Sequence, residues 1–410
     1  MARHLPPFGT LKLTREEEFA VRQQASEVIQ RALALEIEYR RQGAQVDVEE
    51  WKKVSRVDDF HVFKQRRRAR RRSDPPARQD TTSSEDIGIP ELFSVREDSG
   101  KQWRESVSNE SEISLSRSPS SGSSGDELRV PEMMCTGNLE GRLEDFMYGV
   151  YDGEDESWRL RAAYTKDTLE DARILATLER PTQDDPFRFL GIKWFSMEYP
   201  PVVGAFIQKR ETLVAHSTGM TMDDQGDPYG YYMMDNFVHS SLPERSESGR
   251  VRNKFRLCLI YRQLTMDRIG VFARSYVDAG GSLSPSLTIT RAALSLSSIT
   301  NGVETAHSKK LAWLMERERG RRRSTATADQ SSVCQSCHKG ALGLLSRSMT
   351  DSHVCGQLFC GKCIVERKLI VDMDASQLTP RALPFCLACV LRAKQLSSVD
   401  LMLTSDSKEQ

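Results

Sequence analysis

Seven of the nine cysteines lie in the last quarter of this 410-residue chain, in three tight groups. The groups are Cys334-x-x-Cys337, Cys355-x4-Cys360-x-x-Cys363 and Cys386-x-x-Cys389. A two-residue gap lets one turn present both sulfur atoms to the same ion, and four thiolates, or three thiolates and one imidazole, complete a tetrahedral zinc site. Three CxxC pairs therefore predict two bound Zn²⁺ ions, with Cys355 and a neighbouring residue supplying the remaining ligands.

Redox dithiols, disulfides and buried apolar thiols are the alternatives for these cysteines. The first residues, MARHLPPFGTLKLTREEE, lack the apolar stretch of a secretory signal, and no apolar run approaches the roughly 20 residues that span a bilayer. We therefore expect a reducing, cytoplasmic location, where clustered thiols bind metal. Cys135 and Cys258 lie far from the groups and are expected to be ordinary core or strand residues.

The formal net charge is zero, but the charges are unevenly distributed. Residues 64–72 are strongly basic, and residues 317–323 carry five arginines. Runs of this kind bind anionic lipid, nucleic acid or an import receptor, or form the solvated edge of a linker. Nucleic acid is the weaker choice because the runs lack interleaved aromatic residues.

The elements that we expect before the zinc module begin with an N-terminal helix. Thr14 and Glu17 form a capping-box pattern, and apolar residues then recur at helical spacing up to Tyr39. A first strand is expected at Val57–Phe63. Between residues 66 and 126, Ser-Pro, Ser-Gly and acidic-serine patches dominate, so burial cannot offset the entropy of ordering, and a disordered insertion is predicted.

After this insertion, Asn138 is expected to cap a short helix that extends to Val150. Six segments then have the β-branched and aromatic character of strands: 158–164, 187–199, 202–217, 229–239, 255–264 and 269–277. Short turn-rich connections such as residues 223–228 favour an antiparallel meander. A long final helix is predicted over Pro285–Arg319, packed across the sheet, which gives an α+β fold.

In this order of elements the chain resembles the START-like lipid-binding domain with its helix-grip fold, over about residues 10–318 apart from the insertion. Arg210-Glu211 stands where that family often has an Arg-Asp pair. The resemblance implies a curved sheet and a last helix that enclose an apolar cavity for a lipid, although each candidate wall residue also fits a filled core. The candidate wall residues are Trp194, Phe206, Met233, Phe255, Tyr276, Leu294 and Ile299.

The run Cys355-Gly-Gln-Leu-Phe-Cys-Gly-Lys-Cys363 resembles the central part of FYVE zinc fingers, and the resemblance covers about residues 326–392. It implies a cross-braced module. One ion takes Cys334, Cys337, Cys360 and Cys363, and the other takes Cys355, Cys386, Cys389 and a fourth ligand. The family's cysteine falls at Ser352, a poor ligand because it is not ionised, so His353 is the predicted fourth ligand. An incomplete or absent second ion, or His338 reaching across, remain alternatives.

FYVE fingers hold phosphatidylinositol 3-phosphate through a basic cluster, but the matching stretch here is Ser348-Met-Thr-Asp-Ser-His353. Asp351 replaces a histidine, so this lipid specificity is not expected to carry over. Leu342, Leu344 and Leu345 form either a membrane-inserting loop or a small packed turn, with Arg347 beside them. Peripheral attachment to an anionic surface, for example on endosomal membranes, would then draw on the arginines of residues 317–323.

The resulting domain assignment is a START-like domain at residues 1–65 and 127–319, a disordered insertion at 66–126, a FYVE-like zinc finger at 326–392 and a tail at 393–410. The sequence lacks a nucleophile elbow, a phosphate-binding Gly-rich loop and a His-Glu-x-x-His site. We therefore expect a non-enzymatic, zinc-binding adaptor that can bind lipid. The alternative is a RING-like ubiquitin ligase, whose cross-brace is similar but whose order of cysteine and histidine differs.

Overall fold

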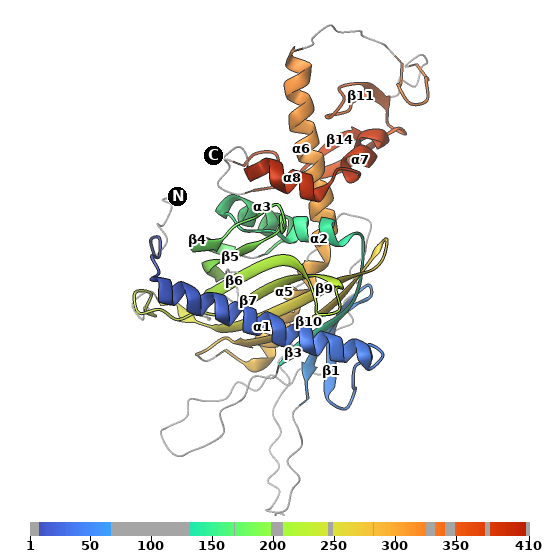
Figure 1. Cartoon of the computed structure of the whole chain (residues 1–410). Coiled ribbons are helices and arrows are strands. Elements are labelled where there is room, and N and C mark those ends of the chain that lie inside the picture. The colour runs from blue at the N-terminus through green and yellow to red at the C-terminus, as the bar shows by residue number, and fades with distance from the viewer. Residues whose placement is uncertain are drawn as a thin grey trace, which may run out of the picture.

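The computed structural model describes residues 8–66, 132–167, 169–197, 208–244, 249–281, 283–324, 333–340, 349–373 and 378–406 (Figure 1). Apart from residue 66, the predicted disordered insertion at 66–126 lies outside the described residues. The described segments form a large sheet with helices on both faces, and a smaller C-terminal module at one end of a long helix (Figure 1).

The N-terminal helix α1 (Arg15–Arg41) begins where the capping box predicts. Thr14 Oγ1 accepts a 3.2 Å hydrogen bond from the Glu17 amide, and the Thr14 amide donates to Glu17 Oε2 at 2.8 Å. The helix lies along one face of the sheet (Figure 1), where Val21, Ala25 and Ala32 are buried. Two oppositely charged side chains also fix it there, because Arg262 Nε on the sheet donates to Glu36 Oε2 at 3.1 Å.

One antiparallel sheet fills the middle of the chain. Its main strands are β1 (Trp51–Val57), β2 (Phe60–Gln65), β3 (Met133–Glu140), β4 (Leu169–Glu179), β5 (Phe189–Met197), β6 (Arg210–Met222), β7 (Pro228–Asn236), β9 (Lys254–Thr265) and β10 (Arg268–Asp278). They are paired in the order β1-β2-β3-β10-β9-β7-β6-β5-β4, and β8 (Val251–Arg252) pairs in parallel with β6. The predicted antiparallel meander is confirmed for β5, β6, β7, β9 and β10.

Several predicted boundaries are wrong, each for a physical reason. The expected strand Val57–Phe63 spans the turn of the β1–β2 hairpin, where Asp58 has a φ of 50°. The expected strand at 158–164 lies in helix α3 (Asp155–Thr165), because its buried positions Trp158, Ala162 and Thr165 recur at helical spacing. Asn138 belongs to β3, and helix α2 (Leu143–Val150) starts five residues later.

The predicted final helix is interrupted. Helix α5 (Pro285–Ser298), a short 3₁₀ turn η2 (Ile299–Asn301) and helix α6 (Gly302–Ser324) replace the single helix expected over 285–319. Helix α5 packs on β1, β2 and β10, and α6 crosses α2. The crossing is close because Gly149 on α2 faces the Gly302 carbonyl, where a Cβ atom at residue 149 would collide.

The C-terminal module is built on the far half of α6 (Figure 1). It contains two hairpins, β11 (Met349–Asp351) with β12 (Leu358–Cys360) and β13 (Ile364–Leu369) with β14 (Arg381–Cys386), followed by α7 (Leu387–Lys394). Leu311, Leu314 and Met315 of α6 share one core with Phe385 and Val390 of this module. The long helix is therefore part of both cores.

The segment 393–410, expected to be a tail, contains helix α8 (Ser398–Asp406). This helix packs against α2 and α6. Its residue Met402 is buried in the core that the large sheet forms with α2 and α5, which we call the middle domain or sheet domain. The chain therefore returns to the sheet domain after completing the cysteine-rich module.

Candidate lipid cavity and candidate metal centre

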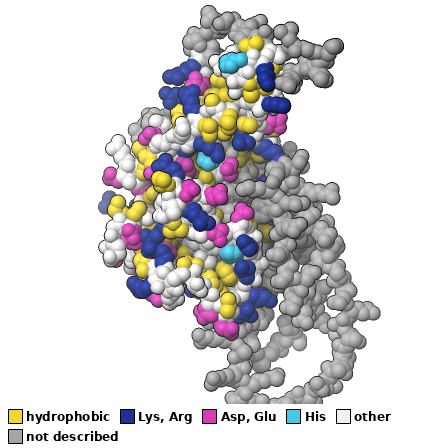
Figure 2. All heavy atoms as spheres, turned by 90° about the vertical axis from the view of Figure 1, so that its right-hand side faces the viewer, with side chains coloured by type: hydrophobic (Ala, Val, Ile, Leu, Met, Phe, Trp, Pro, Cys, Tyr) yellow, Lys and Arg dark blue, Asp and Glu magenta, His cyan; other side chains and the backbone are white. Residues whose placement is uncertain are grey.

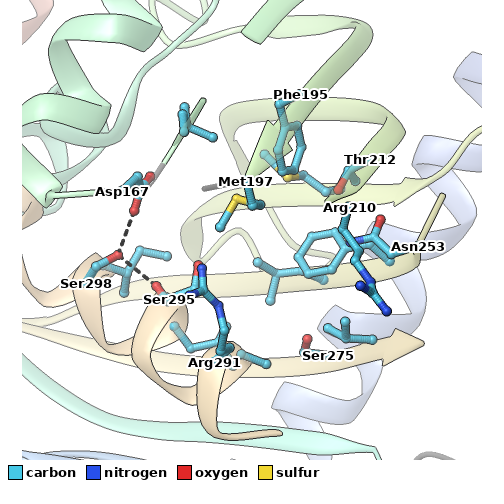
Figure 3. A pocket seen from close by; sticks show the side chains of 18 of the residues that line it. Asp167, Phe195, Met197, Arg210, Thr212, Asn253, Ser275, Arg291, Ser295 and Ser298 are labelled. Atoms are coloured by element: carbon cyan, nitrogen blue, oxygen red, sulfur yellow. Dashed lines mark hydrogen bonds between the residues drawn. The ribbon is translucent and has the colours of Figure 1, made fainter. Parts of the chain in front are cut away.

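A cavity of about 170 Å³ lies between the sheet and helices α3 and α5. One buried water needs about 10–15 Å³ of such room, so the space is far larger than a packing defect. Its apolar wall comes from strands at one side and from α5 at the other (Figure 3). The main apolar residues are Phe195, Met197, Met234, Phe255, Leu257, Ala292, Leu296 and Ile299.

Polar side chains lie at two sides of this cavity. Arg210, Thr212 and Asn253 gather at one side, and Asp167, Ser295 and Ser298 lie at the other (Figure 3). Arg210 is 3% exposed, and its guanidinium donates to the carbonyl oxygens of residues 208, 279 and 280. A buried guanidinium held by neutral carbonyls keeps its positive charge within the cavity wall.

The Arg210-Glu211 pair noted in the sequence is divided between the two faces of the sheet. Successive side chains of a strand point to opposite faces. Glu211 therefore accepts hydrogen bonds from Trp194 Nε1 at 3.1 Å and from Arg252 Nη2 at 2.6 Å, on the side away from the cavity. Arg210 and Glu211 therefore do not form an ion pair with each other.

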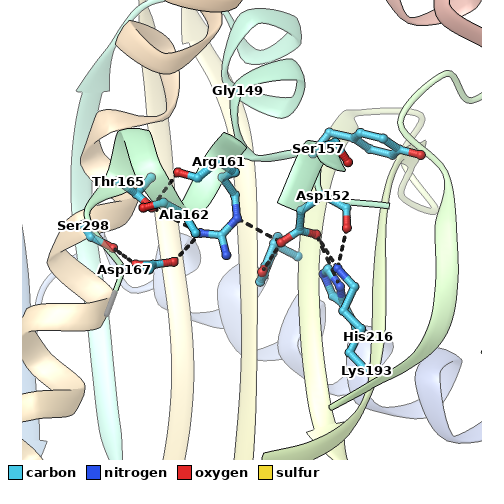
Figure 4. Close-up of polar contacts among 12 residues, drawn as sticks. Gly149, Asp152, Ser157, Arg161, Ala162, Thr165, Asp167, Lys193, His216 and Ser298 are labelled. Atoms are coloured by element: carbon cyan, nitrogen blue, oxygen red, sulfur yellow. Dashed lines mark hydrogen bonds and ion pairs between the residues drawn. The ribbon is translucent and has the colours of Figure 1, made fainter. Parts of the chain in front are cut away.

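Behind the cavity wall lies a network of buried, oppositely charged side chains (Figure 4). Asp152 is fully buried and binds Lys193 Nζ at 2.7 Å and Arg161 Nε at 2.9 Å, and Arg161 Nη1 reaches Asp167 at 2.7 Å. Burial would raise the pKa of Asp152, but Lys193, His216 and Arg161 together hold it below its usual value. Burial lowers the pKa of Lys193 to about 8. This network fixes Arg161 and Asp167 where they line the cavity.

Some of the predicted wall residues line the cavity and others do not, mainly because successive side chains of a strand point to opposite faces of the sheet. Phe255 and Ile299 line the cavity. Trp194 and Met233 instead lie in the core beneath α1, while their neighbours Phe195 and Met234 face the cavity. Tyr276 is half-buried outside the lining, Leu294 is 46% exposed on α5, and Phe206 lies outside the described residues. The sequence analysis missed the register of β5 and β7, which decides which of two adjacent residues points into the cavity.

The first predicted metal group is assembled as expected. The sulfur atoms of Cys334, Cys337, Cys360 and Cys363 all lie within 4.8 Å of one another. Cys337 Sγ and Cys360 Sγ are 3.7 Å apart, close to the edge of about 3.8 Å that a tetrahedron with Zn–S bonds of about 2.3 Å requires. Amides of Cys337 and Cys360 lower the pKa of the Cys334 thiol to about 6. Against a hydrogen bond with Ser336, burial and the neighbouring thiols raise the pKa of Cys363 to about 11, so the fit to a metal rests on the spacing of the sulfur atoms. The donor set therefore fits Zn²⁺.

The second group contains Cys355, Cys386 and Cys389, again within 4.8 Å of one another, with 4.0 Å between Cys355 Sγ and Cys386 Sγ. A hydrogen bond from Cys389 is the largest of the effects that lower the pKa of Cys355 to about 5. His353 is not part of this close group, and its role as a ligand stays a prediction. Its ring lies 6.0 Å from that of Phe385.

The predicted membrane contacts Leu342, Leu344, Leu345 and Arg347 lie outside the described residues. Two other apolar residues of the module are exposed, Leu387 at 55% and Leu391 at 50%, one turn apart on α7. In the space-filling view, Lys and Arg side chains lie beside hydrophobic ones at the upper end of the molecule (Figure 2). Among the described residues, no helix combines the length and apolar character needed to cross a membrane.

Comparison with known proteins finds solved structures that are similar at low sequence identity. No protein-family model and no curated protein matches the chain. Among solved structures, it is similar to human STARD10, with 10% identity, a TM-score of 0.35 and coverage of 78% of this chain and 86% of that one. It is also similar to human StAR-related lipid transfer protein 5, with 12% identity, a TM-score of 0.38 and coverage of 70% and 99%.

A third similar structure is the STAR-related lipid transfer protein of Xanthomonas axonopodis, with 10% identity, a TM-score of 0.33 and coverage of 62% of this chain and 99% of that one. A large antiparallel sheet closed by a C-terminal helix agrees with the START-like architecture expected from the sequence, and the two cysteine groups are able to hold metal ions.

Proposed function

We propose that this chain is a non-enzymatic adaptor that holds a lipid in its middle domain and uses two zinc ions to build its C-terminal module. The single observation that carries the lipid-binding part is the cavity between the sheet and α5. Ligand pockets are concave and mostly apolar, with a few placed polar groups. Phe195, Phe255 and Leu296 provide the apolar wall, and Arg210 provides a positive charge within it.

The proposed role of zinc is structural. Each cysteine group gathers at least three thiols around one point, and four protein ligands leave no position for a reacting water. The strands β11 and β12 have three residues each, too short to hold a fold alone. Metal binding would therefore supply the folding free energy of this module, and the proposal assigns no catalytic residue.

We also propose peripheral attachment of the module to an anionic membrane from the cytoplasmic side. Over residues 333–340, 349–373 and 378–394, seven Lys and Arg residues stand against three Asp and Glu residues. Seven thiolates with two Zn²⁺ ions carry a further net charge of −3, so the module keeps a small positive charge. The exposed Leu387 and Leu391 offer apolar contact on the same module. Attraction of basic groups to anionic lipids is worth about 1 kcal/mol for each charge near the surface. Because Asp351 replaces a basic-cluster residue, this attachment should not require a 3-phosphoinositide.

Lipid extraction and mass spectrometry of the full chain, after incubation with vesicles of mixed phospholipids and sterol, tests the cavity. Ala292→Phe fills it, whereas Leu294→Phe places the same ring on the exposed side of the same helix. We expect bound lipid in the wild type and in Leu294→Phe, and several-fold less in Ala292→Phe. Circular dichroism checks that each variant folds. Absence of bound lipid in the wild type, or equal amounts in two folded variants, would contradict the proposal.

Vesicle flotation tests attachment, using phosphatidylcholine alone or with phosphatidylserine or phosphatidylinositol 3-phosphate. Both anionic vesicles should carry the chain upward, and Leu391→Ser should weaken this while Leu264→Ser, at an equally exposed site on β9, should not. Recovery of the chain only with phosphatidylinositol 3-phosphate would instead favour a specific headgroup site. No binding to any anionic vesicle would remove the membrane from the proposed function.

A further inference from the structure

We propose that the second metal site is a Cys3Ser site, in which the hydroxyl oxygen of Ser352 takes the fourth corner and His353 takes no part. This inference rests on the proposed structural role of zinc. It replaces the imidazole expected from the sequence, and it makes the two metal sites chemically unequal.

The turn around Ser352 has the same hydrogen bonds as the turn around Cys334. In the first turn, the His338 amide donates to the Cys334 carbonyl at 2.8 Å, and the Cys334 amide donates to the Lys339 carbonyl at 3.1 Å. In the second, Gly356 donates to the Ser352 carbonyl at 2.8 Å, and Ser352 donates to the Gln357 carbonyl at 3.0 Å.

The backbone conformation repeats as well. The fifth residue of each turn has a positive φ, 56° at His338 and 71° at Gly356. In both turns the fourth residue, Cys337 or Cys355, is a member of a metal group. The two turns are therefore two copies of one ligand-presenting turn, and positions one and four of each copy present ligands.

This equivalence assigns each residue of the second turn. Ser352 stands at the position of Cys334, and His353 stands at the position of Gln335, which is not a ligand position. The His353 amide donates to the Pro384 carbonyl at 3.0 Å, and its ring lies beside Phe385. The ring nitrogens of His353 do not lie within 4.8 Å of all three sulfur atoms.

Ser352 is placed and buried as a ligand would be. It has 0% of its surface exposed, the same value as Cys334. Its Oγ accepts a 3.2 Å hydrogen bond from the amide of Cys386, one of the three cysteines of the site. The Ser352 oxygen therefore lies beside the backbone of Cys386 and away from solvent.

The chemical consequence is a weaker second site. Four thiolates around Zn²⁺ give the first site a net charge of −2, whereas three thiolates and a neutral hydroxyl give the second a net charge of −1. A hydroxyl is a poorer donor to zinc than a thiolate. The second ion should therefore leave first when a chelator competes for it.

Zinc content and zinc release of the full chain test this assignment, with a colorimetric chelator and a non-thiol reductant. We expect two ions per chain, released in two phases. Ser352→Cys should slow the fast phase by at least about tenfold, and Ser352→Ala should speed it. His353→Ala should leave both ions and both phases unchanged. With Co²⁺ in place of zinc, Ser352→Cys should raise the sulfur charge-transfer absorbance in proportion to eight thiolates instead of seven.

Loss of one ion in a folded His353→Ala variant would overturn the proposal, as would an unchanged fast phase in Ser352→Cys. Either result would leave the structural role of zinc intact. A wild-type chain that binds no zinc would instead overturn the proposed function and the Ser352 assignment together.

Discussion

Lys310 on α6 donates a 2.6 Å hydrogen bond to Asp145 on α2, and this buried pair joins the middle domain to the cysteine-rich module. Ser398, at the start of α8, donates to the same carboxylate oxygen at 2.7 Å. Lys310 also donates to the carbonyl of Leu396 at 2.6 Å. Three helices therefore meet at one carboxylate, which links the two cores more firmly than a flexible linker would.

The first prediction is that Lys310→Met destabilises the whole chain. The Lys310 side chain is 1% exposed, so its removal leaves the buried Asp145 carboxylate without its nearest cation. Breaking a buried pair in this way costs about 3 kcal/mol or more. Denaturant unfolding measures the loss. Arg319→Met, which breaks the exposed pair with Glu316 on the same helix, should cost about 1 kcal/mol or less. Equal small losses would show that the junction does not hold the two cores.

The second prediction concerns pH at the same junction. Burial alone would lower the pKa of His307, but its interactions with Asp145 and Glu304, at 3.8 and 3.7 Å, raise it above 6.5 despite opposition from Lys394. A folded-state pKa above the unfolded value means that the protonated ring stabilises the fold. This stabilisation is complete below pH 6.5 and is lost as the pH rises through the folded-state pKa.

Unfolding free energies across pH 5.5 to 8.5 should therefore show a fall for the wild type that His307→Gln removes. Glu304→Gln, which removes one of the two carboxylates beside the ring, should reduce the fall without abolishing it. A pH profile that His307→Gln leaves unchanged would refute the assignment to this histidine.

Sequence patterns predicted well the elements whose interacting residues lie close together in the chain. The capping box of α1 and the meander from β5 to β10 depend on residues near one another in the sequence. The paired cysteine turns are likewise visible as spacing. Strand β3 (Met133–Glu140) was missed because it pairs with β2 and β10, far along the chain. Among the described strands, β4 pairs only with the next strand, β5, and was missed because this half-buried edge strand lacks a clear alternation of buried and exposed residues.

The candidate cavity was harder to predict because a one-residue difference in register exchanges the two faces of a strand. Trp194 and Met233 looked suitable by size and apolar character, yet Phe195 and Met234 face inward. The Asp152–Lys193 pair gave no local signal, since 41 residues separate its members. At the metal site, ligand preference favoured His353, whereas the matching hydrogen bonds and backbone conformation of the two turns, which the sequence does not show, favour Ser352.

The third prediction is that Asp152→Asn strongly destabilises the sheet domain. Lys193 and Arg161 would lose the carboxylate that neutralises them, and Lys193 is fully buried between the rings of Trp158 and Phe189. The expected loss is about 3 kcal/mol or more in denaturant unfolding. Asp155→Asn, whose pair with Arg173 is half-exposed, is the matched control and should cost about 1 kcal/mol or less. Similar losses for both variants would contradict a special role for Asp152.

The fourth prediction tests whether the last helix belongs to the middle domain. Met402 on α8 is 6% exposed within the main core, so Met402→Ala should cost about 2 kcal/mol or more. Leu391→Ala on α7, at a residue that is 50% exposed, should change stability by about 0.5 kcal/mol or less. Thermal or denaturant unfolding of the full chain provides the measurement. If both variants unfold like the wild type, the return of the chain to the sheet domain is not stabilising.

The last prediction follows from the shared core of α6 and the cysteine-rich module. If zinc holds the module together, chelation should release residues 333–394 and also uncover Leu311, Leu314 and Met315 on α6. Amide hydrogen exchange should then accelerate in the module and in the second half of α6, while α1 and the central strands stay protected. Restoring zinc should restore the slow exchange. Equal protection of the module before and after exhaustive chelation would mean that its short strands and helix α7 hold their shape without metal, because protein packing alone then suffices.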